Sequence, residues 1–215
     1  MAVWACSGDL SGATLFLYGF RFPITMKSFL IAILLCISSL GVAQVRPEDG
    51  GHEWQVWTGG GHSVPGGTGK TGVWNVGLRY GWILTRPHGP GFLKGRFEYA
   101  LDAMPLFLVF QPANTAVGAG VNPVNLKWNF ATRDKLAPYM ELDGGTLFTN
   151  HDVPRFTSNI NFTTSLALGT HVLGEKYNWS IEARYMHISN AGLSVPNPGI
   201  NTFQVRLGIG RFFPK

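Results

Sequence analysis

The chain has 215 residues, of which 45% are hydrophobic and 13% are charged, and its formal net charge is +5. Ordinary soluble domains carry about 25% charged residues, so this composition argues against one. The positive excess is small and no basic stripe accompanies it, which excludes a nucleic-acid-binding protein. Glycine (28 residues) and aromatic residues (13%) are abundant. The mixture favours an all-β protein with an apolar exterior.

The N-terminal stretch has the layout of an export signal. Met26 is followed by one positive charge, Lys27, by an apolar run over 29–37 and by small residues up to position 43. This three-part layout is typical of a secretory signal peptide, and the run is shorter than the ~20 residues of a spanning helix. We expect translation to start at Met26, residues 1–43 to lie outside the fold, and one barrel domain to span 44–215.

Cysteine and histidine placement limits the chemistry of the mature chain. Both cysteines, Cys6 and Cys36, precede position 44. Disulfides, thiolate metal sites and cysteine nucleophiles are therefore not expected after cleavage. The histidines show no metal-ligand spacing. We expect neither a metal ion nor another cofactor.

From Gln44 onward the chain shows repeated alternation of apolar and polar residues, which is the signal of half-buried strands. In the stretch around 74–84, Trp, Val, Leu and Tyr side chains alternate with Asn, Gly and Arg. Stretches rich in Gly, Pro, Asn and Asp separate the alternating segments. Eight such segments are expected, at about 53–60, 70–86, 92–110, 117–131, 136–148, 158–172, 177–190 and 200–213.

The strand pattern is that of a membrane barrel. Most segments exceed the 9–11 residues that a tilted strand needs to cross a bilayer, and their apolar face carries Trp and Tyr. An open sheet edge in lipid would leave backbone groups unsatisfied, so the sheet must close. The sequence predicts an all-β fold, an eight-stranded antiparallel transmembrane β-barrel in the bacterial outer membrane. A soluble eight-stranded barrel such as a lipocalin is the alternative, but its exterior would carry more charge.

The strand count also sets the orientation. With both termini in the periplasm, loops near 61–69, 111–116, 149–157 and 191–199 face the outside. The glycine-rich stretch 66–72 lacks the first glycine of a phosphate-binding loop, because position 64 is Val. It is interpreted as a flexible external loop. Charged residues on the inward parity predict a paired network in the lumen, formed by Lys94, Arg96, Glu98, Asp102, Glu141, Arg184 and Arg206.

The stretch HISNAGLSVPNPGIN, residues 187–201, places polar residues where lipid is expected. His187, Ser189 and Asn201 share the parity of the apolar rows of the seventh and eighth segments, so all three should face outward. Residues two apart on a strand lie about 6.6 Å apart on one face. An imidazole at 187 can then act as the general base for a serine nucleophile at 189. Candidate oxyanion donors are Asn190, Asn197 and the backbone N–H of Gly192.

At these residues the chain resembles the outer-membrane lipid A 3-O-deacylases, the PagL-type acyloxyacyl hydrolases. Their motif is His-x-Ser-Asn-Ala-Gly on the seventh strand, then Pro-Asn-x-Gly-Ile and an acid at the start of the eighth. The resemblance implies an esterase that removes an ester-linked acyl chain from lipid A of lipopolysaccharide in the outer leaflet. It assigns Ser189 as the nucleophile, His187 as the base and no cofactor. The family's acid is Glu, and here that position is Asn201.

The change to Asn keeps a second interpretation open. An Asn carbonyl can orient a histidine, as in the Cys-His-Asn arrangement, but it cannot stabilise an imidazolium by charge. The alternative is therefore a catalytically weak or inactive barrel with a structural or lipopolysaccharide-binding role. A pore is disfavoured, because side chains fill the interior of an eight-stranded barrel. The sequence leaves open whether the barrel forms a homodimer.

Overall fold

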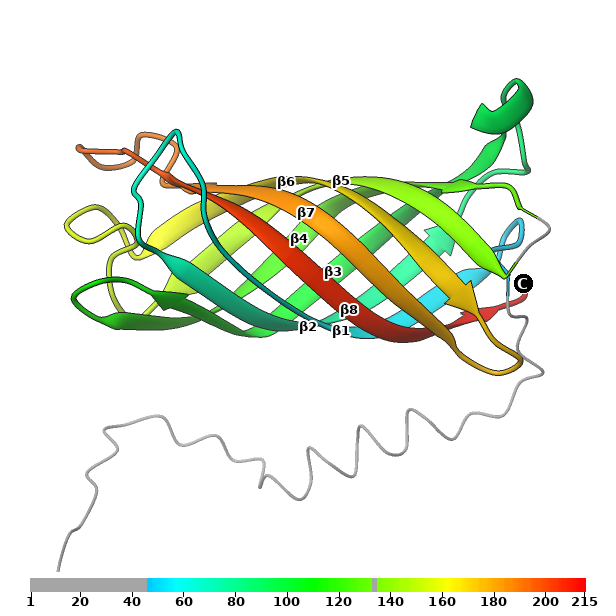
Figure 1. Ribbon diagram of the computed structural model, residues 1–215, viewed down its shortest axis with the longest axis horizontal. Coiled ribbons are helices and arrows are strands. Elements are labelled where there is room, and N and C mark those ends of the chain that lie inside the picture. The colour runs from blue at the N-terminus through cyan, green and yellow to red at the C-terminus, as the bar shows by residue number, and fades with distance from the viewer. Residues whose placement is uncertain (1–45, 133–134) are drawn as a thin grey trace, which may run out of the picture. The chain divides into compact units, whose positions relative to one another are not determined.

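The computed structural model describes residues 46–132 and 135–215, and these form a closed antiparallel barrel (Figure 1). Each strand pairs with the next, and β8 pairs with β1. The fold confirms the predicted eight-stranded antiparallel barrel, and every strand begins and ends within about three residues of the expected bounds. The strands are β1 (His52–Ser63), β2 (Gly72–Ile83), β3 (Gly95–Phe110), β4 (Thr115–Phe130), β5 (Leu136–Thr149), β6 (Ile160–Leu173), β7 (Asn178–Ser189) and β8 (Ile200–Phe213).

Helical structure is scarce among the described residues. A single 3₁₀ turn, Gly91–Leu93, lies in the connection between β2 and β3. The part of the chain that the structure describes holds no helix long and apolar enough to cross a membrane. The expected signal peptide, 1–43, falls outside the described residues.

The outside of the barrel is apolar, as the alternation predicted. On β7, Trp179 and Ile181 are exposed, while Ser180 and Glu182 between them are buried. The other strands repeat this pattern. Tyr80 packs 4.5 Å from Trp82, centroid to centroid, near the end of the barrel that carries the 3₁₀ turn. Aromatic girdles of this kind mark the membrane interface in outer-membrane barrels.

Charged side chains fill the middle of the barrel. Arg79 donates to Asp102 at 2.8 Å and to Glu141 at 2.5 and 2.8 Å. Arg184 also donates to Glu141, and Lys127 donates to Glu53 at 2.6 Å. Such pairing offsets the cost of burying each charge. The described residues that take part are Glu53, Arg79, Glu98, Asp102, Lys127, Glu141, Asp143, Glu182, Arg184 and Arg206.

Two of the seven charges expected in this network lie elsewhere. Lys94 is exposed, because it precedes the first residue of β3 and belongs to the connection. Arg96 is half-buried and lines a small pocket at the mouth of the barrel. The network therefore begins deeper in the barrel than the sequence pattern suggested.

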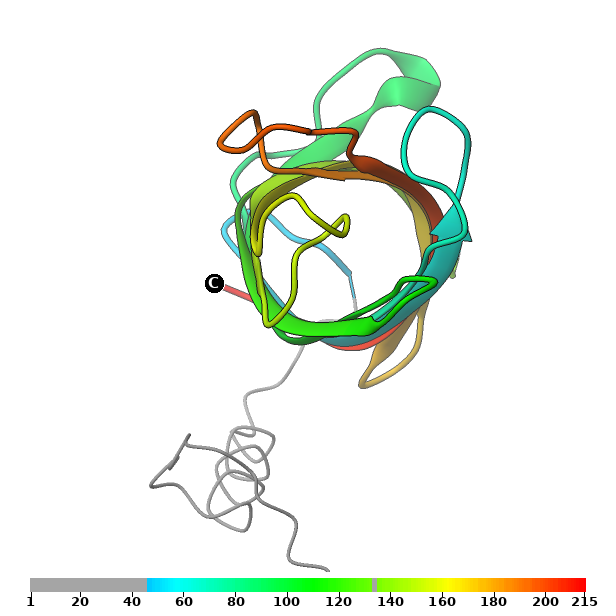
Figure 2. The ribbon, with the colours of Figure 1, turned by 90° about the vertical axis from the view of Figure 1, so that its left-hand side faces the viewer.

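An apolar layer fills the interior between the charged residues and the end of the barrel that carries the β5–β6 loop. It contains Trp57, Phe107 and Leu147 together with Met186 and Ile188 of β7 and Ile200 of β8. Val153, in the loop between β5 and β6, is fully buried in the same layer. Figure 2 shows that loop, in yellow, folded over the open end of the barrel. Dense packing on the inner side makes the ends of β7 and β8 a rigid wall.

Candidate active site

The end of β7 and the start of β8 bring the predicted site residues together. His187 pairs directly with Asn201 across the two strands, and Ser189 follows two residues later. His187 and Ser189 are half-buried and continue the outward row of Ile181 and Tyr185. Their inward neighbours, Met186 and Ile188, are buried. The expected outward orientation is therefore confirmed for this strand.

Asn201 forms a hydrogen bond with the histidine. Its Oδ1 lies 2.6 Å from Nδ1 of His187. An amide oxygen only accepts, so Nδ1 carries the proton in this arrangement. In the neutral ring Nε2 then holds the free lone pair, which a general base requires.

Ser189 lies on the same outward face of β7 as His187. Within residues 46–132 and 135–215 no hydrogen bond joins its hydroxyl to the imidazole of His187. Catalytic hydrogen bonds are often long in a site without substrate. The strand spacing of about 6.6 Å leaves the hydroxyl within reach of a ring that leans along the strand.

Hydrogen-bond donors of the loop after Ser189 bind acceptors within the same loop. Nδ2 of Asn190 donates to the carbonyl of Ser194 at 3.1 Å, and the N–H of Gly192 donates to Oδ1 of Asn190 at 2.9 Å. Asn190 is fully buried. Two of the three expected oxyanion donors are thus engaged within the loop, because the turn closes on the Asn190 side chain. Backbone with positive φ, 52° at Ala191 and 82° at Gly192, forms this turn.

Asn197 differs from those two residues. It is exposed, and its Oδ1 accepts the N–H of Asn190 at 3.2 Å. Its Nδ2 has no partner among the described residues and can donate to a ligand. Asn197 is thus the member of the predicted trio whose donor is not engaged within the loop.

Sequence reasoning missed the part played by the loop between β1 and β2. The N–H of Val64 donates to the carbonyl of Asn201 at 2.8 Å, and the N–H of Thr68 donates to that of Gly199 at 2.9 Å. The loop, drawn in teal in Figure 1, therefore lies against the start of β8. It leaves Asn201 only 7% exposed although this residue has outward parity. Its glycine content suggested flexibility, and no local signal predicted the contact.

Neighbouring side chains on β6 also line the site. Phe162 pairs with Ser189, and Thr164 pairs with His187 on the side away from Asn201. Both side chains are exposed. Leu193 and Val195, in the loop after Ser189, are 67% and 90% exposed. The three polar side chains thus lie beside an apolar surface suited to acyl chains.

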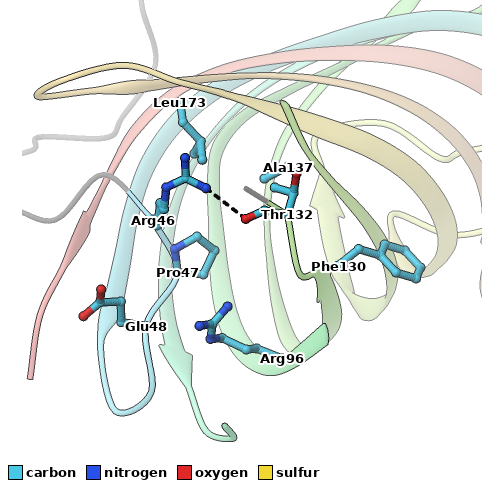
Figure 3. A pocket seen from close by; sticks show the side chains of 8 residues that line it. All are labelled: Arg46, Pro47, Glu48, Arg96, Phe130, Thr132, Ala137 and Leu173. Atoms are coloured by element: carbon cyan, nitrogen blue, oxygen red, sulfur yellow. Dashed lines mark hydrogen bonds between the residues drawn. The ribbon is translucent and has the colours of Figure 1, made fainter. Parts of the chain in front are cut away.

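Other parts of the structure offer less. A pocket of about 90 Å³ lies at the end of the barrel where β4 ends and β5 begins, and there Nη1 of Arg46 donates to the carbonyl of Thr132 at 2.9 Å (Figure 3). It is far smaller than a drug-sized ligand site, which is about 300–1,000 Å³. No group of three His, Cys, Asp or Glu side chains among the described residues could hold a metal ion.

Comparison with known proteins agrees with the fold and the motif. The family model for lipid A 3-O-deacylase (PagL) matches residues 48–210. The crystal structure of the outer membrane enzyme PagL aligns with a TM-score of 0.57 at 20% identity, covering 75% of this chain and 99% of that one. That of Neisserial surface protein A (NspA) gives 0.53 at 10% identity, covering 77% and 99%. No curated protein matches the chain.

These findings define the class of protein and then its family. A closed barrel with an apolar exterior is the architecture of an outer-membrane protein, and together with the family match it defines a protein of the bacterial outer membrane. The family match extends over most of the chain and includes the motif at 187–201. The chain belongs to the lipid A 3-O-deacylase (PagL) family.

Proposed function

We propose that this protein removes an ester-linked acyl chain from lipid A, with Ser189 as the nucleophile and His187 as the base. The observation that carries the proposal is the 2.6 Å contact between His187 Nδ1 and Asn201 Oδ1, on the lipid-facing row that also holds Ser189. Polar residues in such a row are costly in hydrocarbon. Here two of them, His187 and Asn201, are joined by the kind of hydrogen bond that orients the base of a serine esterase.

The first half of the reaction acylates the serine. Oγ of Ser189 attacks the ester carbonyl while Nε2 of His187 takes the hydroxyl proton. Nδ2 of Asn197 donates to the oxyanion of the tetrahedral intermediate. When the intermediate collapses, the C–O bond of the ester breaks and the sugar oxygen takes the proton from His187. The acyl chain remains on Ser189.

Water completes the cycle. His187 takes a proton from a water molecule, whose oxygen attacks the acyl-serine carbonyl. Collapse of this second intermediate releases the fatty acid and returns the proton to Ser189. Asn201 holds the ring by its Nδ1–H throughout. Asn190 and Gly192 shape the turn after Ser189, and they would join as oxyanion donors only if the loop rearranges on binding.

The placement of the site fits a lipid substrate. A lipid A molecule in the outer leaflet can present its ester to the outward row without leaving the membrane. Phe162 and the exposed loop residues Leu193 and Val195 would contact its acyl chains. Burial of such apolar area stabilises binding by about 25 cal/mol per Å².

Mass spectrometry of lipid A tests the proposal. Lipid A is extracted from cells that express the native protein or its Ser189→Ala variant, with equal amounts of folded barrel in the outer membrane. Loss of one hydroxyacyl chain with the native protein alone supports the esterase. Identical spectra would reject it and favour the non-catalytic barrel, for which the uncharged Asn201 is the specific argument.

A further inference from the structure

The loop between β1 and β2 packs closely against Asn201, which is hydrogen-bonded to His187, and against Gly199. A Cβ atom added at Gly66 would lie 2.8 Å from Nδ2 of Asn201, and one added at Gly67 would lie 2.9 Å from the carbonyl oxygen of Gly199. Real Cβ atoms do not approach so closely without displacing a neighbour. The loop backbone therefore lies so close to the Asn201 amide that no side chain fits between them.

The same contact continues to the histidine. A Cβ added at Gly199 would lie 2.8 Å from Cε1 of His187. The imidazole is thus hydrogen-bonded to Asn201 at Nδ1, and on its Cε1 side Gly199 lies so close that a side chain there would not fit. Since the loop bonds to both residues through Val64 and Thr68, three layers form in sequence: loop, Asn201 with Gly199, and imidazole.

The loop has internal hydrogen bonds that fix its ends. The N–H of Ser63 donates to the carbonyl of Thr71 at 2.7 Å, and Oγ of Ser63 accepts the N–H of Thr71 at 3.1 Å. Thr71 is buried. A segment tied at its base and at two points on β8 can transmit a fixed position to what it touches.

From this geometry we infer that the β1–β2 loop is a positioning element of the site. Its glycine backbone at 66 and 67 sets the orientation of Asn201, and through it the ring of His187. The inference rests on the proposed function, since it assigns the loop a part in that reaction. Gly66 and Gly67 are positioning residues because they act through Asn201 and Gly199. Only the oxygen end of the Asn201 amide can accept the Nδ1–H of His187, and the nitrogen end is the one that lies beside Gly66.

Three single-glycine variants separate this role from a general effect of altering the loop. Gly66→Ala presses on the Asn201 amide, but Gly66 has a φ of +106°, so the change also strains the backbone. Gly67→Ala presses on Gly199 at a position without positive φ. Gly69→Ala is the matched control, because a Cβ there meets nothing within 4 Å.

The kinetic test uses the full-length barrel, purified in detergent and shown to be folded, with lipid A as the substrate. Gly66→Ala and Gly67→Ala should each lower kcat by at least about tenfold, toward the roughly 10²-fold that a 1 Å misplacement costs. KM and the Gly69→Ala control should stay at native values. Equal kcat in all four proteins would overturn the inference while leaving the proposed function intact.

A second measurement tests the inference even if the native protein shows no deacylation. NMR of nitrogen-labelled histidine reports the hydrogen bond at Nδ1 of His187. The resonance should move in Gly66→Ala and Gly67→Ala and stay in place in Gly69→Ala. If it stays in place in all three, the loop does not position the ring.

A double-variant cycle identifies the route of the effect. In an Asn201→Ala background, Gly66→Ala should lower kcat no further, because the residue through which it acts has been removed. Full additivity of the two changes would show that the loop acts by another route and would overturn the inference.

Discussion

Polar residues inside this barrel and polar residues at the rim formed by β7 and β8 differ in their bonding partners. Inside the barrel, Arg79, Glu141 and Arg184 are fully buried and form ion pairs, so each buried charge is compensated by an opposite one. At the outer ends of β7 and β8, uncharged polar side chains face outward and bond only to each other or to loops. The inward polar residues here are neutralised by one another, whereas under the proposed function the outward His187 and Ser189 are left accessible to a lipid substrate.

The largest effect should come from the outward site. Replacing His187 with Gln removes the base and should lower kcat by about 10⁴-fold or more, as loss of a central catalytic group does. Unfolding in urea should be unchanged, because the side chain is half-exposed and its inner neighbours stay packed. The measurement pairs lipid A deacylation with a urea titration. A stable variant that retains activity would remove the distinction between the two regions.

The next effect should come from the inside and show the reverse pattern. Glu141→Gln leaves Arg79 and Arg184 without a shared carboxylate, and breaking a buried pair costs about 3–5 kcal/mol. The midpoint of urea unfolding should fall accordingly, while kcat of the folded protein stays native. Glu175→Gln in the exposed turn between β6 and β7 is the control and should change stability by less than about 0.5 kcal/mol. A native midpoint for Glu141→Gln would contradict the structural role of the network.

A smaller change should sharpen the role of Asn201. Asn201→Glu restores a carboxylate beside Nδ1 of His187, and charge-assisted hydrogen bonds are roughly twice as strong as neutral ones. We expect kcat to rise about tenfold, which corresponds to ~1.4 kcal/mol. The comparison is made with Asn201→Leu, which lacks an acceptor and should be slower than native. A fall in kcat for Asn201→Glu would show that this site is adapted to the amide.

The smallest effect concerns substrate contact. Phe162 pairs with Ser189, so Phe162→Ala should remove apolar contact with an acyl chain and raise KM about threefold with kcat unchanged. Leu168→Ala, on the same outward row but six positions further from Ser189, is the control and should leave KM unchanged. Equal KM changes in both variants would place the acyl chain elsewhere.

The strand layout and the motif could be predicted from the sequence, but the contacts that the loops make could not. Period-two alternation is local, so β7 and its outward His187 and Ser189 were predictable from the residues alone. The burial of Asn201 depends on Val64 and Thr68, more than 130 residues earlier in the chain. Likewise, the engagement of Asn190 with Ser194 reflects loop conformation rather than residue type. Contacts between distant loops have no periodic signal to reveal them.

Covalent labelling is the most direct test of whether Ser189 is a nucleophile activated by His187. A lipophilic fluorophosphonate is added to the folded native barrel, and the modified peptide is identified by mass spectrometry. We expect one label, on Ser189, whose formation is abolished in His187→Gln and which blocks lipid A deacylation. Deacylation that continues with Ser189 fully labelled, or a label that forms equally well without His187, would contradict it.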